Sequence, residues 1–227
     1  MESGESVMGT ASATVEADRT AILVDFGGVM TSSVLRAFEE FGSSLGGDPN
    51  LPLRLLGRDE ASRRLLSDHE SGLIDEGAFE RGFAERLRAH GATVDAEGLV
   101  ARMQAGLVPD TDTMALISEV RAAGYPVALV SNAFGRDCYA GFDLDAMADR
   151  VVISSEVGIR KPSRRIYSLA CEQLGVPPTR AVMIDDLRQN LDGAARLGIA
   201  GLLHTDAGDT RRQLAERFGI RVRRTAA

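Results

Sequence analysis

Five short apolar runs, each followed directly by polar residues, most constrain what this chain can fold into. The runs cover residues 21–24, 127–130, 151–153, 181–184 and 201–203. Short segments that are apolar throughout are typical of strands buried on both faces. We therefore predict five strands in a sheet that helices cover on both sides.

The segments between the later runs have helical patterns. Residues 111–123 place Met114, Ile117 and Val120 three residues apart, and Gly124 follows as a stop signal. Similar patterns cover 165–174 and 190–197. Strands that alternate with helices of this length form βαβ crossovers in a parallel sheet. The predicted fold class is α/β, with a Rossmann-like parallel sheet and helices on both faces.

The stretch 33–108 differs from the rest because it has helical patterns and no buried-strand run. We predict that it forms an α-helical cap, inserted into an α/β core made of 19–32 and 109–227. An insert after the first strand would cover the strand ends like a lid. Residues 1–18, rich in Ser, Thr, Ala and Gly, are predicted to be a flexible tail.

Charge and composition narrow the classes of partner. The net charge of −7 argues against binding to a nucleic-acid backbone, which requires many Lys and Arg side chains. No apolar run is long enough to span a membrane, and the first residues lack the pattern of a secretory signal. Cys138 and Cys171 match no metal-ligand spacing and indicate a reduced pair. We expect a cytoplasmic protein without membrane or nucleic-acid partners, and the sequence leaves its oligomeric state open.

Potentially reactive side chains follow the predicted strands. Asp25 follows the first run, Ser131 and Asn132 follow the second, and Asp185 and Asp186 follow the fourth. Parallel strands gather ligands at their carboxyl ends, so we expect these side chains to meet at one edge of the sheet.

One lysine completes this set. Lys161 follows the third run and is the only lysine among the 26 basic residues. Together these groups suit phosphoryl transfer, in which a carboxylate such as Asp25 attacks phosphorus to form an aspartyl-phosphate. Mg²⁺ and a fixed ammonium would offset the repulsion between carboxylate and phosphate. Mg²⁺ prefers oxygen ligands, so two carboxylates and a backbone carbonyl would suffice.

In order along the chain, these segments resemble the four motifs of the haloacid dehalogenase-like (HAD) hydrolases, specifically the members with a cap inserted after the first motif. The matching stretches are Asp-Phe-Gly-Gly-Val at 25–29, Val-Ser-Asn at 130–132, Gly-Ile-Arg-Lys-Pro at 158–162 and Ile-Asp-Asp at 184–186, followed by Asn190 and 193–198. The resemblance extends from residue 21 to about 205.

The resemblance implies a role for each residue around the metal. Asp25 would be the nucleophile and a Mg²⁺ ligand, and the carbonyl of Gly27 and the carboxylate of Asp186 would be further ligands. Asp185 and Asn190 would support this site without binding the metal themselves.

The resemblance also implies how the substrate is held. Ser131 and the amide of Asn132 would bind the transferring phosphoryl group, and Lys161 would bridge that group and the nucleophile. These roles predict a Mg²⁺-dependent phosphatase that acts on a small organic phosphate ester.

The sequence departs from the family pattern at Gly27. Many phosphatases of this family have a second Asp there as general acid and base, a contribution typically worth about 10²–10⁴-fold in rate. Two alternatives therefore stay open. One is a metal-independent 2-haloacid dehalogenase, in which Asp25 attacks carbon, and the other is a non-catalytic HAD-fold protein that binds a ligand or regulates a partner.

Structural explanations exist for the same residues. Asp25 and the Asp185–Asp186 pair could cap turns or helices, Ser131 with Asn132 could form a turn, and Lys161 could lie in an exposed loop.

Several residues outside the motifs allow two interpretations. His69, in the predicted cap, could touch substrate or be structural, and the acid-rich residues around it (68–76) are predicted to be a solvated helix start. Phe134 and Arg136 could line the pocket mouth or begin a helix.

Overall fold

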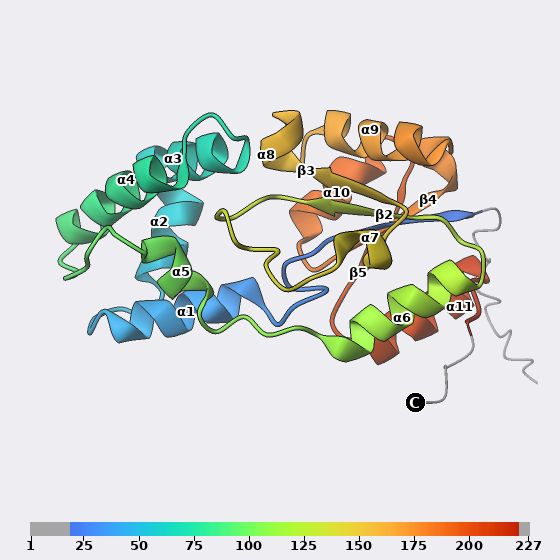
Figure 1. Cartoon of the computed structure of the whole chain (residues 1–227), viewed down its shortest axis with the longest axis horizontal. Coiled ribbons are helices and arrows are strands. Elements are labelled where there is room, and N and C mark those ends of the chain that lie inside the picture. Colours follow the sequence, from blue (N-terminus) through green and yellow to red (C-terminus); the bar gives the residue numbers. More distant parts are fainter. Residues whose placement is uncertain (1–18, 223–227) are drawn as a thin grey trace, which may run out of the picture.

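The computed structural model describes residues 19–222, so the tail predicted at 1–18 lies outside the described residues. Its centre is one parallel five-stranded sheet with the strand order β3-β2-β1-β4-β5 (Figure 1). The strands are β1 (Ala21–Val24), β2 (Val127–Ser131), β3 (Arg150–Ile153), β4 (Ala181–Asp185) and β5 (Ala200–Leu203). The predicted α/β class is confirmed, and each of the five apolar runs forms a strand.

Helices cover both faces of the sheet, which explains why the strands are apolar throughout. One face carries α6 (Thr111–Ala122) and α11 (Ala207–Phe218), and the other carries α9 (Arg164–Leu174) and α10 (Arg188–Ala195) (Figure 1). Successive side chains of a strand point to opposite faces. Accordingly, Ile22 and Val24 belong to the apolar cluster with α6 and α11, whereas Leu23 belongs to the cluster with α9 and α10.

Four helices around the sheet differ from the sequence prediction, and two of them, α7 (Leu144–Met147) and α8 (Ser154–Val157), are short and were not predicted. Helix α10 begins at Arg188, two residues before the predicted start, with Leu187 at the N-cap position. Helix α11 was not predicted, because only Thr210, Leu214 and Phe218 are buried in an otherwise polar segment.

Of the six helices between β1 and β2, the first five form the left-hand part of the molecule in Figure 1. These inserted helices are α1 (Val34–Ser44), α2 (Leu51–Arg58), α3 (Glu60–Glu70), α4 (Glu76–Ala89) and α5 (Leu99–Gln104). They bury an apolar cluster of their own, which includes Phe38, Leu55, Phe83 and Met103. The segments that lead into and out of these inserted helices lie side by side, joined by an antiparallel bridge between Thr31 and Pro109. The exact cap boundaries, 33 and 108, stay a prediction.

Polar contacts join the end of α3 and the start of α4 to the loop after β2. Nε2 of His69 accepts a hydrogen bond from the amide of Gly135 (3.1 Å), and the carboxylate of Glu76 accepts one from the amide of Arg136 (2.6 Å). His69 and Glu70 are buried. The prediction of a solvated segment at 68–76 is therefore wrong for these two residues, because the core covers them.

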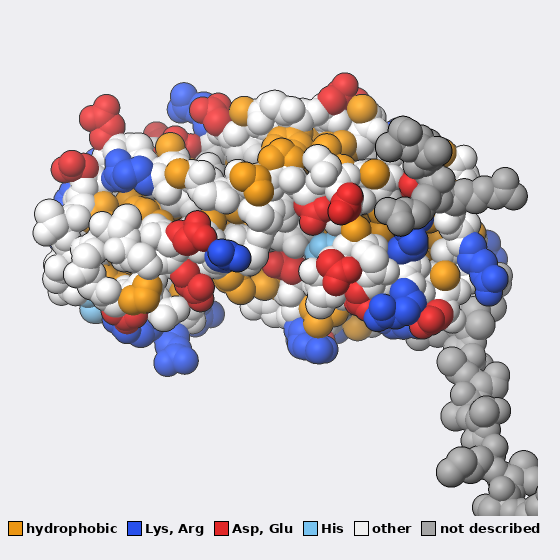
Figure 2. Space-filling view, turned by 90° about the horizontal axis from the view of Figure 1, so that it is seen from below, with side chains coloured by type: hydrophobic (Ala, Val, Ile, Leu, Met, Phe, Trp, Pro, Cys, Tyr) orange, Lys and Arg blue, Asp and Glu red, His pale blue; other side chains and the backbone are white. Residues whose placement is uncertain are grey.

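The surface that Figure 2 shows has acidic and basic side chains interspersed, without a continuous basic strip on that face. Among the helices of residues 19–222, none has both the length and the apolar character needed to cross a bilayer.

Candidate active site

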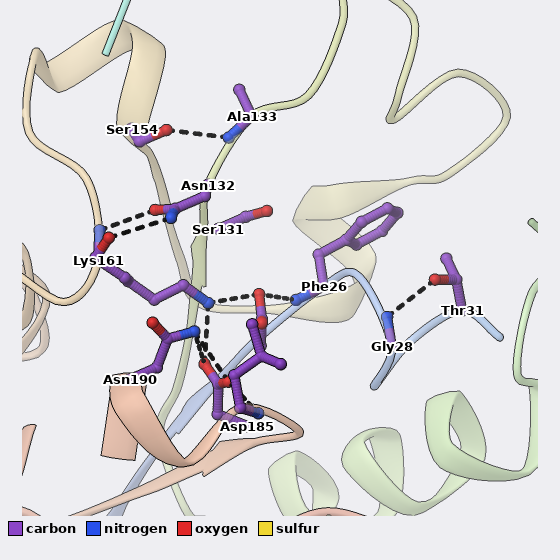
Figure 3. A network of polar contacts seen from close by, with 12 residues as sticks. Phe26, Gly28, Thr31, Ser131, Asn132, Ala133, Ser154, Lys161, Asp185 and Asn190 are labelled. Atoms are coloured by element: carbon purple, nitrogen blue, oxygen red, sulfur yellow. Dashed lines mark hydrogen bonds and ion pairs between the residues drawn. The ribbon is translucent and has the colours of Figure 1, made fainter. Parts of the chain in front are cut away.

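The carboxyl ends of the strands bring Asp25 and Lys161 into direct contact. Nζ of Lys161 lies 2.6 Å from Oδ1 of Asp25 and 3.0 Å from Oδ2 of Asp185. Figure 3 shows the lysine side chain reaching from its loop toward the ends of the strands, where dashed lines mark these ion pairs. Asp25 and Asp185 end adjacent strands, β1 and β4, which explains how one ammonium reaches both carboxylates.

Burial and charge set the protonation of this pair. Burial, which outweighs the attraction of the Lys161 ammonium, raises the pKa of Asp25 well above its usual value. Burial lowers the pKa of Lys161, but the carboxylates of Asp25 and Asp185 more than reverse that effect, so the pKa lies above the ordinary value. Lys161 therefore stays a cation and can donate hydrogen bonds to an anion next to Asp25.

The backbone of Lys161 is held by the side chain of Asn132. Oδ1 of Asn132 accepts a hydrogen bond from the amide of Lys161 (2.8 Å), and its Nδ2 donates one to the carbonyl of Lys161 (3.2 Å) (Figure 3). This side chain therefore fixes the lysine loop to the end of β2. The predicted binding of phosphate by the Asn132 amide stays a prediction.

Ser131 ends β2 and is buried beside Asp25 in the same cavity. Its hydroxyl oxygen accepts a hydrogen bond from the hydroxyl group of Tyr139 (2.8 Å). The ring of Tyr139 stacks edge-on against Phe26, with 4.9 Å between ring centroids. Tyr139 was not predicted, because it belongs to a loop without a regular pattern.

Asp185 is fully buried, and both of its carboxylate oxygens accept hydrogen bonds. Besides Lys161, it accepts bonds from the amide of Leu187 (2.9 Å) and from Nδ2 of Asn190 (3.0 and 3.1 Å to its two oxygens). Asn190 lies in the first turns of α10, and its carbonyl accepts a bond from the hydroxyl of Tyr167 (2.8 Å). The predicted supporting residues thus form one network that fixes the ammonium.

Asp186 has the features of a cation ligand. Oxygens of Asp25, Asp185 and Asp186 lie within 4.8 Å of one another. Burial, and then the negative charge of Asp185, raise the pKa of Asp186 to about 6. Its Oδ1 is buried without a hydrogen-bond partner. The single positive charge of Lys161 does not balance the negative charges of three clustered carboxylates. Carboxylate oxygens without a partner are suitable ligands for Mg²⁺, so the residues present fit this ion.

The residue at position 27 brings no acid to the site. Gly27 lines the cavity, and a β-carbon there would lie 2.9 Å from Cγ2 of Val34 at the start of α1. Any side chain at this position would therefore press on the inserted helices. Gly27 is the predicted departure from the family pattern. Here the apolar side chain of Val34 lies where the carboxyl group of an Asp would need to fit.

All the predicted site residues except the buried Asp185 line a single cavity of about 610 Å³ between the sheet and the inserted helices. Glu70 and Arg160 form an ion pair in the lining of this cavity. Burial raises the pKa of Glu70 to about 7, although Arg160 and Lys161 oppose that shift. This pair was not predicted from the sequence, because its members are separated by a long stretch of chain. His69, by contrast, is not among the residues that line the cavity.

Comparison with known protein sequences agrees with this geometry. The sequence model of the haloacid dehalogenase-like hydrolases matches residues 20–198. A (S)-2-haloacid dehalogenase 4A of Burkholderia cepacia is 30% identical over 46% of the chain and 48% of that enzyme. A phosphoserine phosphatase of Thermus thermophilus is 33% identical over 57% of the chain and 55% of that enzyme. The matches thus span about half the length of these two relatives, which carry out different reactions.

Solved structures share the fold at low sequence identity. A HAD family enzyme of Bacteroides thetaiotaomicron, in complex with magnesium and inorganic phosphate, has a TM-score of 0.58 at 24% identity and covers 82% of this chain and 94% of its own. A dehalogenase with an intermediate complex has a TM-score of 0.63 at 22% identity, over 83% of this chain and 86% of its own. With the sequence match over most of its length and the same fold, this chain belongs to the haloacid dehalogenase-like hydrolases.

Proposed function

We propose that the protein is a Mg²⁺-dependent phosphatase of small organic phosphate esters that uses Asp25 as its nucleophile. One observation carries this proposal. The ammonium of Lys161 contacts Asp25, while the neighbouring carboxylate of Asp186 keeps a buried oxygen without a partner. The first group suits a phosphoryl anion, and the second suits a divalent cation.

In the first half-reaction, a carboxylate oxygen of Asp25 attacks phosphorus, and the bond between phosphorus and the alcohol oxygen breaks. The products are an aspartyl-phosphate and the alcohol. Lys161 and the hydroxyl of Ser131 hold the phosphoryl oxygens in line with Asp25. Mg²⁺ held by Asp25 and Asp186, with the carbonyl of Gly27, would supply positive charge against the phosphoryl oxygens.

In the second half-reaction, water attacks phosphorus and the bond to Asp25 breaks, which releases inorganic phosphate and restores the carboxylate. The water loses a proton, and the departing alcohol of the first step gains one. Gly27 supplies no carboxyl for either transfer, so solvent must carry these protons or another cavity residue must do so. The proposed enzyme therefore favours esters whose alcohols leave readily, such as aryl phosphates.

Phosphate release from an aryl phosphate tests the proposal directly. We expect turnover with millimolar Mg²⁺, loss of turnover with EDTA, and loss by at least three orders of magnitude in Asp25→Asn. Asp112→Asn makes the same chemical change at an exposed position of α6 and should retain activity. A lack of Mg²⁺-dependent turnover across a broad panel of phosphates would contradict the proposal.

The comparisons and Gly27 favour one second candidate, a 2-haloacid dehalogenase. In that reaction the carboxylate of Asp25 attacks carbon, halide leaves, and no metal takes part. The acidic cluster speaks against it, since Asp186 would repel a carboxylate substrate without a compensating cation. Halide release from 2-chloropropionate that persists in EDTA would establish this reaction instead.

Beryllium fluoride distinguishes the proposed phosphatase from a protein that only binds or regulates. With Mg²⁺ it mimics an aspartyl-phosphate, so an intact site should raise the melting temperature of the protein when both are present. The same addition should leave Asp25→Asn unchanged.

A further inference from the structure

The cavity is much larger than a phosphoryl group requires, and its lining is mainly apolar on the side of the inserted helices. Its volume of about 610 Å³ lies within the range of pockets that bind small organic molecules. The inserted helices line it with Val34, Leu35, Phe38, Leu53, Leu56 and Leu66. These side chains come from three different helices, α1, α2 and α3, which all present apolar groups to this space.

The described side chains that line the outer part offer a ligand no free cation, although the acid of Asp137 and the amide of Gln189 belong to the lining. Glu70 and Arg160 are paired with each other, and Nε2 of Gln104 donates a hydrogen bond to the carbonyl of Phe134. Among the described residues that line the cavity, the cations are Arg160 and Lys161. Since Lys161 serves the phosphate end and Arg160 is paired with Glu70, neither cation is free to face a second anionic group.

Apolar surface is also left open to water at this cavity. Leu35 and Val108 are 45% and 58% exposed, and both line the cavity. Only three large hydrophobic residues of the described chain are this exposed, and the third, Leu73, lies elsewhere. An apolar ligand that covers such exposed side chains removes their surface from water, which contributes favourably to the free energy of binding.

We propose that the substrate is a phosphate monoester of an uncharged, apolar alcohol, with an alkyl or aryl group that fills the space under α1–α3. This inference rests on the proposed phosphatase function. It separates the protein from the relatives named for polar substrates, such as phosphoserine and glyceraldehyde 3-phosphate. Phosphoserine, for example, carries a carboxylate besides its phosphate, and the described residues of the lining hold no free cation for that second anion.

Binding of methyl-, butyl- and octylphosphonate in the presence of Mg²⁺ tests this proposal without requiring turnover. Burial of each added methylene should tighten binding roughly two- to fourfold over the first few carbons. Butylphosphonate should therefore bind at least about tenfold more tightly than methylphosphonate. A constant affinity along the series, or tighter binding of a phosphonate analogue of phosphoserine, would overturn the proposal.

Two leucine variants supply a matched comparison. Leu35→Gln places an amide in the cavity and should weaken octylphosphonate binding about fivefold or more, with methylphosphonate unaffected. Leu73→Gln makes the same change at an exposed leucine outside the cavity and should alter neither affinity. Equal effects of the two variants would contradict the proposed pocket.

The outcomes also separate the two proposals. Binding of methylphosphonate without any gain from chain length refutes the apolar substrate but leaves the phosphatase intact. Failure of every phosphonate to bind, together with no hydrolysis of aryl phosphate, refutes the phosphatase itself and the inference with it.

Discussion

Gly28 lies so close to Asp186 that a β-carbon at position 28 would stand 2.3 Å from Oδ2 of that carboxylate. The backbone of Gly28 also has a positive φ of 79°, and its amide donates a hydrogen bond to the hydroxyl of Thr31 (3.1 Å). Position 28 therefore requires glycine for two physical reasons: its backbone is left-handed, and the Asp186 carboxylate leaves no room for a side chain. The second reason concerns function, because Asp186 is the proposed metal ligand.

Gly28→Ala should displace Asp186 and weaken Mg²⁺ binding at least tenfold, in addition to a backbone cost of about 1–2 kcal/mol. Gly175→Ala is the matched control, since Gly175 has a similar φ of 70° and open space around its Cβ position. Calorimetric titration with Mg²⁺ measures the first effect, and thermal unfolding measures the second. Equal Mg²⁺ affinity in the two variants would show that Asp186 does not bind the ion.

Asn132→Ala should reduce kcat by as much as about 10², because the loop that carries Lys161 loses both hydrogen bonds that fix its backbone. Steady-state kinetics with an aryl phosphate measure the loss. Asn50→Ala, at an exposed position whose side chain makes no capping hydrogen bond, should leave kcat unchanged. A normal kcat in Asn132→Ala would mean that Lys161 is held in place without this clamp.

Tyr139→Phe removes the hydroxyl that donates to Ser131 and keeps the ring that stacks on Phe26. We expect weaker inhibition by inorganic phosphate, by roughly three- to tenfold, and a stability loss of about 1 kcal/mol for one hydrogen bond. Tyr125→Phe, which removes a hydroxyl outside the cavity, serves as the control. If both variants bind phosphate equally well, Tyr139 plays no part in orienting Ser131.

The Glu70–Arg160 pair predicts a pH dependence of stability. The pKa of Glu70 rises from 4.5 to about 7 on folding, mainly through burial. Because the folded pKa is the higher one, this group contributes stability that is fully present below pH 4.5 and is lost as pH rises through about 7. The loss is on the order of 3 kcal/mol.

Glu70→Gln removes the titrating group, so the unfolding free energy of this variant should change less than that of the wild type between pH 5 and 8. Denaturant unfolding at a series of pH values measures the difference. Glu39→Gln changes an exposed acid of α1 and should keep the wild-type slope. Parallel curves for Glu70→Gln and the wild type would exclude Glu70 as the source.

The sequence alone determined the sheet and the segments that carry the reactive groups. Strands buried on both faces must be apolar throughout, so runs such as 21–24 and 181–184 could be identified without structural information. Because parallel strands share one carboxyl edge, the polar residues that follow them, such as Asp25 and Asp185, could be expected to converge. The lone Lys161 stood out for a different reason, since arginine takes every other basic position.

Only the tertiary structure decided what surrounds that edge. The pairing of Glu70 with Arg160 and the hydrogen bond between His69 and Gly135 join segments far apart in the chain, and the contact of Tyr139 with Ser131 depends on the irregular course of the loop between them. Local patterns report which face of an element is apolar, but they contain no information about which distant segment covers that face. The apolar outer cavity depends on how α1, α2 and α3 pack over the strand ends, and that arrangement arises from packing that no single segment encodes.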